Sequence, residues 1–307
     1  MNQPPHHLSE ATIPRASVGI FALHLLIAGL LLTAAHAYTQ PAAGGAPGRE
    51  AKITKWARFR AGVTVAYGLV EGDRVRQVTG DPFGAWKPTR KTFALADVTL
   101  LVPTEPSKVL AAALNYKSHL GAVPERPLPK TPEFFFKPPS CLIAPGEPIV
   151  LPKDSEQVHF EGELVLVIGK RASKVPVEQA LDYLLGVTCG NDVSARDWQK
   201  NDIQWWRAKG TDTFGPCGPF IVSGLNYDDL QLRLRVNGKV LQEERTSQMA
   251  QNVARLISHA SHYVTLEPGD LIYTGTPGET SALKSGDVVE VEIEGVGVLR
   301  NPVVNAP

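Results

Sequence analysis

Alternation of polar and apolar residues is the main pattern of the chain after residue 51. It runs through TKWARFR (54–60) and VTVAYGLVEGDRVRQVTG (63–80), with a Glu-Gly-Asp turn at 71–73. Strand side chains point alternately to the two faces of a sheet, so this pattern predicts a β-hairpin. We expect a loop in DPFGAWKPTRKT and a further strand in FALADVTLLVP. These elements predict a small N-terminal β domain over residues 52–104.

Strands also dominate the larger part of the chain, residues 105–303. KVLAAALN and ELVLVIGK are apolar runs of strand length. QLRLRVNGKVLQEE contains Asn237-Gly238, which is the strongest short signal for a two-residue hairpin turn. DVVEVEIEGVGVLRN alternates Val and Ile with Glu and predicts two strands joined near Gly295.

Two segments have the 3.6-residue period of a helix. In VPVEQALDYLLGVTCGND, an apolar face at Val177, Ala180, Leu181 and Leu184 predicts a helix that leads into a strand. NVARLISHASHYVTLEPGD predicts a helix that ends before Pro268.

The first fifty-one residues have a different character. Residues 16–35 carry no formal charge, Arg15 precedes them, and Ala35-His36-Ala37 follows as an A-x-A pattern. This order is typical of a secretory signal peptide, so we expect export to a periplasm or the medium after cleavage near Ala37. Twenty apolar residues also suffice to span a bilayer, which leaves an uncleaved membrane anchor open over residues 1–37. A core helix behind a misassigned start would instead leave the protein cytoplasmic. Residues 38–51, rich in Pro, Gly and Ala, predict a linker.

The amino-acid composition argues against several classes of protein. With 31 basic and 31 acidic side chains among 307 residues, the chain lacks the basic excess of a nucleic-acid-binding protein. An apolar fraction of 43% is enough for a sizeable core and excludes a wholly disordered chain. The three cysteines, Cys141, Cys189 and Cys217, are too few and too scattered for a disulfide framework or a zinc site.

Three carboxylates are the candidate chemical centre. Glu161 and Glu163 are two apart at the start of a predicted strand and therefore point to the same face. Asp192 ends another apolar segment, so the three converge if the two strands are neighbours. Three oxygen ligands without histidine favour Mg²⁺, Mn²⁺ or Ca²⁺ over Zn²⁺. The alternative is that both glutamates are solvated strand residues and Asp192 caps a turn.

Six motifs in order give the chain a family resemblance. They are ALNYKSH (113–119), EFFFKPPS (133–140), FEGELVLVIG (160–169), GNDVSARDWQ (190–199), KGTDTFGPCGP (209–219) and YTGTPG (273–278). Over about residues 105–303 the chain resembles the fumarylacetoacetate hydrolase family, and KWARFR through GDPFGAW resembles the small domain that precedes it in some members. The resemblance implies an α+β, β-rich fold built as a roll of mixed sheets, a divalent metal and a homodimer. It also implies small dioxo or oxo carboxylic acids as substrates.

The same resemblance implies roles for individual residues. It implies metal ligands at Glu161, Glu163 and Asp192, with Mg²⁺ as the expected ion. It implies catalytic roles for His119 and Lys209. The Asn-Tyr-x-x-His motif begins at Asn115, and the residues implied to contact substrate are Tyr116, Lys137, Arg196, Gln199 and Thr276.

Two positions depart from the family pattern. Many hydrolytic members have a glutamate three residues after the motif histidine, where this chain has Ala122. The nearest acid is Glu125, which either replaces that glutamate as the partner of His119 or leaves the dyad absent. His159 stands before FEGE, where the family pattern has an acid.

These features leave three functional hypotheses. The first is a metal-dependent hydrolase of C–C bonds in acylpyruvate- or fumarylacetoacetate-type acids, acting through a metal-chelated enolate. The second is an isomerase, decarboxylase or lyase of the same family, of the 2-hydroxyhepta-2,4-diene-1,7-dioate isomerase or ureidoglycolate lyase type. The third is a protein that binds a metal or ligand without catalysis.

Overall fold

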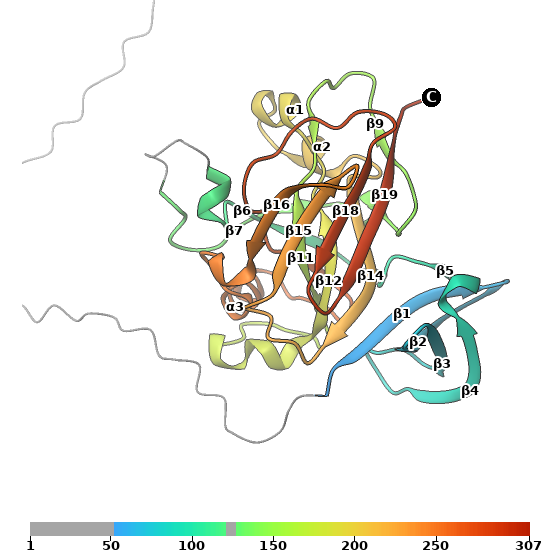
Figure 1. Ribbon diagram of the computed structural model, residues 1–307. Helices are drawn as coiled ribbons and strands as arrows, with labels where there is room; N and C mark the ends of the chain where they lie inside the picture. The colour runs from blue at the N-terminus through green and yellow to red at the C-terminus, as the bar shows by residue number, and fades with distance from the viewer. Residues whose placement is uncertain (1–51, 121–126) are drawn as a thin grey trace, which may run out of the picture. The chain divides into compact units, whose positions relative to one another are not determined.

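The computed structural model describes residues 52–120 and 127–307 (Figure 1). The predicted signal or anchor segment, the linker and Glu125 lie outside the described residues. Among the residues described, no helix is both long enough and apolar enough to cross a membrane.

The N-terminal part is a set of antiparallel strands. They are β1 (Thr54–Ala61), β2 (Thr64–Glu71), β3 (Arg74–Thr79), β4 (Lys87–Ala94) and β5 (Thr99–Leu100). The predicted hairpin is confirmed, because β2 pairs with β3 around Gly72, whose φ is +65°. The prediction of a loop in KPTRKT was wrong, because these residues lie in β4 and pair with β3. Most of the β4 side chains are solvent-exposed, so no apolar alternation marks the strand.

One large sheet continues from these strands into the rest of the chain. Strand β1 pairs antiparallel with β14 (Gly215–Ser223), and Trp56 lies opposite Ile221. Within the described residues this sheet has twelve strands, ten of them in the order β4-β3-β2-β1-β14-β12-β11-β17-β6-β7. The further members are β6 (Val109–Ala113), β7 (Glu133–Lys137), β8 (Leu142–Ile143), β11 (Gly162–Ile168), β12 (Leu184–Asn191) and β17 (Leu271–Tyr273).

A second sheet packs against the middle of the first. Its order is β16 (Lys239–Arg245), β15 (Gln231–Val236), β18 (Val288–Ile293), β19 (Gly297–Asn305) and β9 (Ile149–Leu151). The predicted turn is confirmed, since Asn237 and Gly238 have φ of +52° and +80°, as a type I′ hairpin requires. A short pair, β10 (Val158–His159) and β13 (Ser194–Ala195), completes the strands described. Parallel and antiparallel pairs occur together, which confirms the predicted β-rich, mixed-sheet class.

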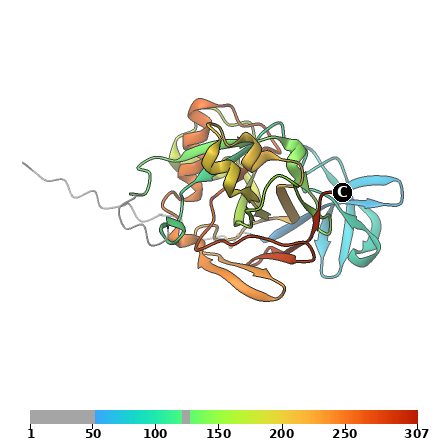
Figure 2. The ribbon, with the colours of Figure 1, turned by 90° about the horizontal axis from the view of Figure 1, so that it is seen from above.

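The helices are few and short. They are α1 (Arg196–Asn201), α2 (Trp206–Gly210) and α3 (Val253–Tyr263), with 3₁₀ turns η1 (Leu95–Asp97), η2 (Lys117–Leu120), η3 (Pro139–Cys141), η4 (Val177–Tyr183) and η5 (Thr246–Gln248). Figure 2 shows α1 and α2 as neighbours. The predicted helix before Pro268 is confirmed as α3, which the Asn252 side chain caps by accepting a hydrogen bond from the Arg255 N–H.

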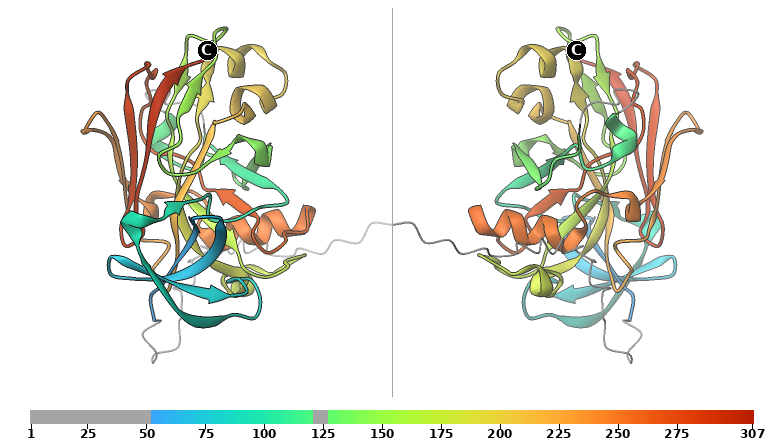
Figure 3. Two further views of the ribbon diagram at one scale, coloured as in Figure 1. Left: turned by 90° about the vertical axis from the view of Figure 1, so that its right-hand side faces the viewer. Right: turned by 90° about the vertical axis from the view of Figure 1, so that its left-hand side faces the viewer.

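The amphipathic helix predicted from residue 177 has a different form. It is the 3₁₀ turn η4, in which Ala180 is buried while Val177 and Leu181 are 41% and 47% exposed. Only seven residues separate Pro176 from the start of β12, which is too short for two full α-helical turns. This turn packs against α3 (Figure 3).

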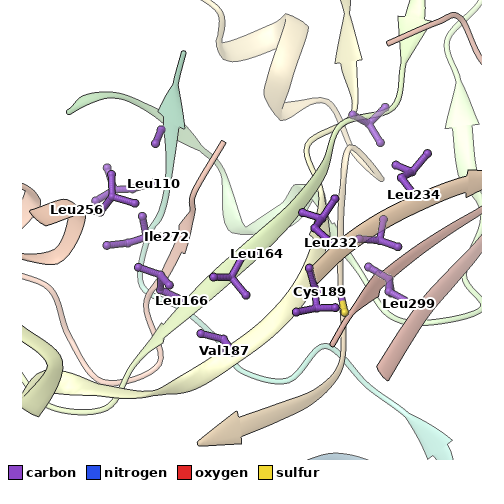
Figure 4. Packing of buried hydrophobic residues seen from close by; sticks show 14 of the residues in the cluster. Leu110, Leu164, Leu166, Val187, Cys189, Leu232, Leu234, Leu256, Ile272 and Leu299 are labelled. Carbon is purple, nitrogen blue, oxygen red and sulfur yellow. The ribbon is translucent and has the colours of Figure 1, made fainter. Parts of the chain in front are cut away.

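The main core lies where the two sheets and α3 meet (Figure 4). Leu164 and Leu166 of β11, Leu232 of β15 and Leu256 of α3 are fully buried there. Every residue of β11 is buried, so the strand is held firmly from both sides. This buried strand begins at the predicted carboxylate site.

Candidate metal and substrate site

Glu161, Glu163 and Asp192 converge at the end of the β11–β12 pair. The two strands are antiparallel with Gly162 opposite Asn191, so the start of one lies beside the end of the other. One carboxylate oxygen from each of the three residues lies within 4.8 Å of the others, and all three side chains are buried. The backbone supports this approach, because the Asp192 N–H donates to the Glu161 carbonyl at 2.8 Å.

Gly162 allows the second sheet to support the cluster. A Cβ at this position would lie 3.0 Å from Leu234 and 3.3 Å from Oε1 of Gln242. The Gly162 N–H donates to that oxygen at 2.9 Å, and Nε2 of Gln242 donates to Oγ1 of Thr276 at 2.9 Å. A single buried amide therefore joins β11, β16 and the TGTPG loop.

Two buried lysines neutralise part of the carboxylate charge. Lys209 Nζ lies 2.5 Å from Glu161 Oε2 and 2.6 Å from Asp192 Oδ2. Lys137 Nζ lies 2.5 Å from Asp192 Oδ1 and also donates to the Lys209 carbonyl. Lys209 lines the cavity described below, whereas Lys137 lies behind Asp192 and is not among the lining residues.

Arg196 and Gln199 meet at the cavity wall. Arg196 forms an ion pair with Oε1 of Glu161, donates to Thr280 Oγ1 at 3.2 Å, and donates to Gln199 Oε1 at 2.8 Å. The same threonine hydroxyl lies 3.0 Å from Nδ1 of His159. A chain of contacts through Thr280 and Arg196 therefore links His159 to Glu161.

His119 is held with one ring nitrogen toward the carboxylates. Its Nδ1 lies 2.8 Å from the Gly278 carbonyl, and its Nε2 lies 3.3 Å from Oε1 of Glu161. A carbonyl only accepts, so Nδ1 carries a hydrogen, and Nε2 is the ring nitrogen that faces the carboxylates. Within the described part of the chain, Glu161 is the one acid within 4.0 Å of this ring.

The Asn115-Tyr116 pair lies behind the cavity wall. The Asn115 amide donates to the carbonyls of Gln251 and Thr274 at 3.0 and 2.8 Å, and its oxygen accepts from the Gln251 N–H at 2.8 Å. Tyr116 is fully buried and is not among the cavity-lining residues, and its hydroxyl has no hydrogen-bond partner among the described residues. Burial, followed by the charges of Glu163 and Glu244, raises the pKa of this phenol far above its usual value. Tyr116 therefore lies in the core that supports the cavity, and its contact with substrate stays a prediction.

The TGTPG loop contributes backbone as well as side chain. The Gly275 N–H donates to Oε2 of Glu163 at 2.7 Å. Gly275 has a φ of +96°, and a Cβ there would lie 2.8 Å from Cβ of Asn115, so glycine is required on both counts. Thr276 is buried, lines the cavity and donates to the Gly162 carbonyl at 2.9 Å.

Glu161 and Glu163 differ in their affinity for protons. Burial tends to raise the pKa of Glu161, but the charges of Lys209 and Arg196 outweigh it and hold that pKa well below its usual range. Burial, reinforced by the charges of Asp192 and Glu161, raises the pKa of Glu163 well above its usual range. Burial lowers the pKa of Lys209, but Asp192 and Glu161 raise it by more. Glu163 therefore binds a proton more tightly than Glu161 does.

A cavity of about 420 Å³ opens over the cluster. Its lining comes from segments far apart in the sequence: Ala112, Ala113, Leu114, His119, Leu120, Phe135, Glu161, Glu163, Asp192, Arg196, Gln199, Lys200, Trp205, Lys209 and Thr276. Sequence analysis missed Leu114, Phe135, Lys200 and Trp205. Phe135 and Trp205 stack edge to face with ring centroids 5.6 Å apart. Their only sequence signal is an aromatic run, which is more often typical of a core.

The donor set fits a divalent cation. The three side chains offer hard carboxylate oxygens, which suit Mg²⁺, Mn²⁺ or Ca²⁺. Glu163 has no lysine, arginine or histidine nitrogen within 4.0 Å in the parts of the chain described, so one carboxyl still lacks a cation. The cluster can therefore hold a metal ion.

Comparison with known proteins finds two family models that together match most of the chain. Residues 108–304 match the family model described as fumarylacetoacetate (FAA) hydrolase C-terminal, and residues 54–103 match the model described as Rv2993c-like, N-terminal. Protein Rv2993c of Mycobacterium tuberculosis is 46% identical over 250 residues, which cover 78% of this chain and 94% of that protein.

Relatives with stated activities are also similar. Oxaloacetate tautomerase fahd2, mitochondrial, of Xenopus laevis is 41% identical over 222 residues, covering 68% of this chain and 69% of the relative. The crystal structure of 5-carboxymethyl-2-hydroxymuconate delta-isomerase from Mycobacterium smegmatis superposes with a TM-score of 0.77 at 43% identity, covering 82% of this chain and all of that one.

Proposed function

Because this chain belongs to the fumarylacetoacetate hydrolase family of enzymes, we propose that it catalyses a metal-dependent proton transfer in an enolisable 2-oxo acid. The product would be an isomer or tautomer of the substrate. The observation that carries this proposal is His119, whose Nε2 faces the carboxylate cluster, with Glu161 as the one acid near its ring in the described residues. Within residues 52–120 and 127–307, such a site has a base for proton transfer but no separate acid to activate water, and Glu125 lies outside these residues. The isomerase and tautomerase among the similar proteins support the same reading.

We infer a metal at Glu161, Glu163 and Asp192, with Mg²⁺ as the expected ion and Mn²⁺ or Ca²⁺ as alternatives. Such an ion would supply Lewis-acid polarisation of the substrate's oxygens. The protein's own contribution is the placement of this donor set next to a base and two cations.

The chain's own groups would divide the remaining work. His119 would accept a proton at Nε2 from the carbon next to the carbonyl and return it to oxygen or to another carbon. Lys209 would stabilise the negative charge that develops on the substrate's oxygen. Arg196 and Gln199 would orient the carboxylate beside that carbonyl. Substrate and product would have the same composition, because the proton that leaves the substrate returns to it.

The test uses the full-length chain with Mg²⁺ and a panel of oxaloacetate, acylpyruvates and related dioxo acids. The ultraviolet absorbance of the enol would be followed with and without a chelator. The products would be identified by mass spectrometry. We expect chelator-sensitive conversion to a product of equal mass. Two fragments would indicate C–C hydrolysis and CO₂ would indicate decarboxylation, and either as the main product would contradict the proposal. Saturable binding of metal and acid without turnover would indicate the non-catalytic role.

We also propose the features that the sequence suggests outside this site. The chain would act as a homodimer, with residues 52–104 as an N-terminal domain on a catalytic domain of residues 105–303. Residues 1–37 would direct export or anchor the chain in a membrane. Light scattering would test the dimer. Separation of membrane and soluble fractions, followed by N-terminal sequencing of the protein found in each, would test the role of residues 1–37.

A further inference from the structure

The helix α1 presents three polar side chains to the cavity. Arg196, Gln199 and Lys200 all line it, and their spacing of i, i+3 and i+4 places them on one helix face. Arg196 is half-buried and Lys200 is exposed, so the row leads from the carboxylate cluster toward solvent. Lys200 is therefore the outermost cation of this row.

The inner cations are already engaged, whereas Lys200 is not. Arg196 pairs with Glu161, and Lys209 bridges Glu161 and Asp192. Lys200 has no carboxylate oxygen within 4.0 Å in residues 52–120 and 127–307. The lining holds three acidic side chains, Glu161, Glu163 and Asp192, and three basic ones, Arg196, Lys200 and Lys209. Lys137 adds a further positive charge from behind Asp192.

An apolar stretch completes the cavity wall. Phe135 and Trp205 meet edge to face, and the Lys209 ammonium lies 5.1 Å from the centre of the Phe135 ring. Flat aromatic surfaces suit a planar, conjugated carbon chain. The lining thus combines a charged inner end, an apolar wall and a free outer cation, within a volume ordinary for a small-molecule site.

We propose that Lys200 is a specificity-determining residue that binds a second carboxylate, which makes the preferred substrate a 2-oxo dicarboxylic acid. This inference rests on the proposed function and adds the substrate's second charged group to it. The acid's 2-oxo end would lie at the carboxylate cluster, and its distal carboxylate would reach the Lys200 ammonium.

The test compares two ligands of equal chain length in the full-length protein with Mg²⁺. Titration calorimetry would measure Kd for 2-oxoadipate and for 2-oxohexanoate, which lacks the distal carboxylate. We expect the wild type to prefer the dicarboxylate by about fivefold, the upper range for an exposed ion pair. Lys200→Met should abolish the preference, and Lys200→Arg should keep most of it. Lys170→Met, which removes an exposed charge outside the cavity lining, should behave as wild type.

Turnover gives an independent readout. The distal carboxylate does not react, so its loss of binding in Lys200→Met should raise KM for a dicarboxylic substrate more than it lowers kcat. A wild type without preference, or a Lys200→Met variant that keeps it, would overturn the role of Lys200 while leaving the proposed reaction intact. Absence of chelator-sensitive turnover on every oxo acid would overturn the proposed reaction itself, and this inference with it.

Discussion

Glu163 differs from the other two carboxylates in having no cationic partner among the described residues. Its Oε2 accepts from the Gly275 N–H at 2.7 Å, while Glu161 and Asp192 share the ammonium of Lys209. We expect Glu163→Gln to weaken Mg²⁺ binding by at least about tenfold and to lower turnover with it, because an amide keeps the shape but loses the charge. Calorimetric metal titration and turnover measure the two effects.

Glu178→Gln, an exposed change on η4, is the matched control for charge and should leave both quantities unchanged. Normal metal affinity in Glu163→Gln would remove Glu163 from the ligand set.

The proton on Glu163 predicts a pH dependence of metal binding. Burial and the charges of Asp192 and Glu161 raise the pKa of this carboxyl well above its usual value, so it binds a proton more tightly than an ordinary glutamate does. A cation must displace that proton, so its apparent affinity should rise with pH until the raised pKa is passed. Titrations in buffers of different ionisation heat would report the released proton. Binding that strengthens as pH falls would contradict this assignment, and Glu163→Gln should flatten the profile.

His119 is expected to matter for turnover far more than for metal affinity. The His119→Ala change removes Nε2, the proposed base, and should lower kcat by about 10²- to 10⁴-fold. Metal affinity should change little, because the three carboxylates remain. His262→Ala, an exposed histidine on α3, is the control. Undiminished turnover in His119→Ala would assign proton transfer to another group.

At the scale of elements, Asp270 joins the starts of two parallel strands. The fully buried carboxylate accepts from the N–H groups of Ser107 and Lys108 before β6 at 2.9 and 3.0 Å, and from the Glu267 N–H at 2.7 Å. Asp270→Ala would leave these donors without partners and should lower the free energy of unfolding by about 3 kcal/mol. Denaturant titration would measure it. A similar turn at the half-buried Asp287 gives the control, Asp287→Ala, with a smaller expected effect.

Sequence patterns predict an element well when one of its faces is buried. The helix α3 is predicted because its polar and apolar faces differ, and the hairpin at Asn237-Gly238 is predicted from its turn residues. The strand β4 was missed because most of its side chains are solvent-exposed at the end of the sheet order. The prediction of an amphipathic helix at η4 was wrong because it took the apolar Val177 and Leu181 to be buried. Both side chains are largely exposed.

The candidate site divides in the same way. The i, i+2 spacing indicated Glu161 and Glu163, and the end of an apolar segment indicated Asp192. The family resemblance added Lys209 and His119. Tyr116 and Lys137 belong to the same motifs but lie behind the cavity wall, since a motif does not specify which side of a loop faces the ligand. The wall residues Phe135, Trp205 and Lys200 come from different segments, and only the tertiary structure brings them together.

At the scale of the molecule, pairing of β1 with β14 links the N-terminal strands to the main sheet. Trp56 is buried in this region and stacks edge to face on Trp86 at 4.8 Å. We therefore expect a single cooperative unfolding transition in calorimetry, and Trp56→Ala should lower stability by about 3–5 kcal/mol. Trp206→Ala, at a 69% exposed position, is the matched control. Separate melting of the N-terminal strands in the wild type would contradict this expectation.

The buried ammonium groups of Lys137 and Lys209 bear on whether the chain can fold before it binds a metal ion. They counter the charge of Glu161 and Asp192 from within, so the chain need not wait for a divalent ion to fold. Folding and metal binding would then be separate steps. If the proposed ion binds at this cluster, folded metal-free protein should take it up without refolding. Stripping and reloading the ion should accordingly be a repeatable cycle.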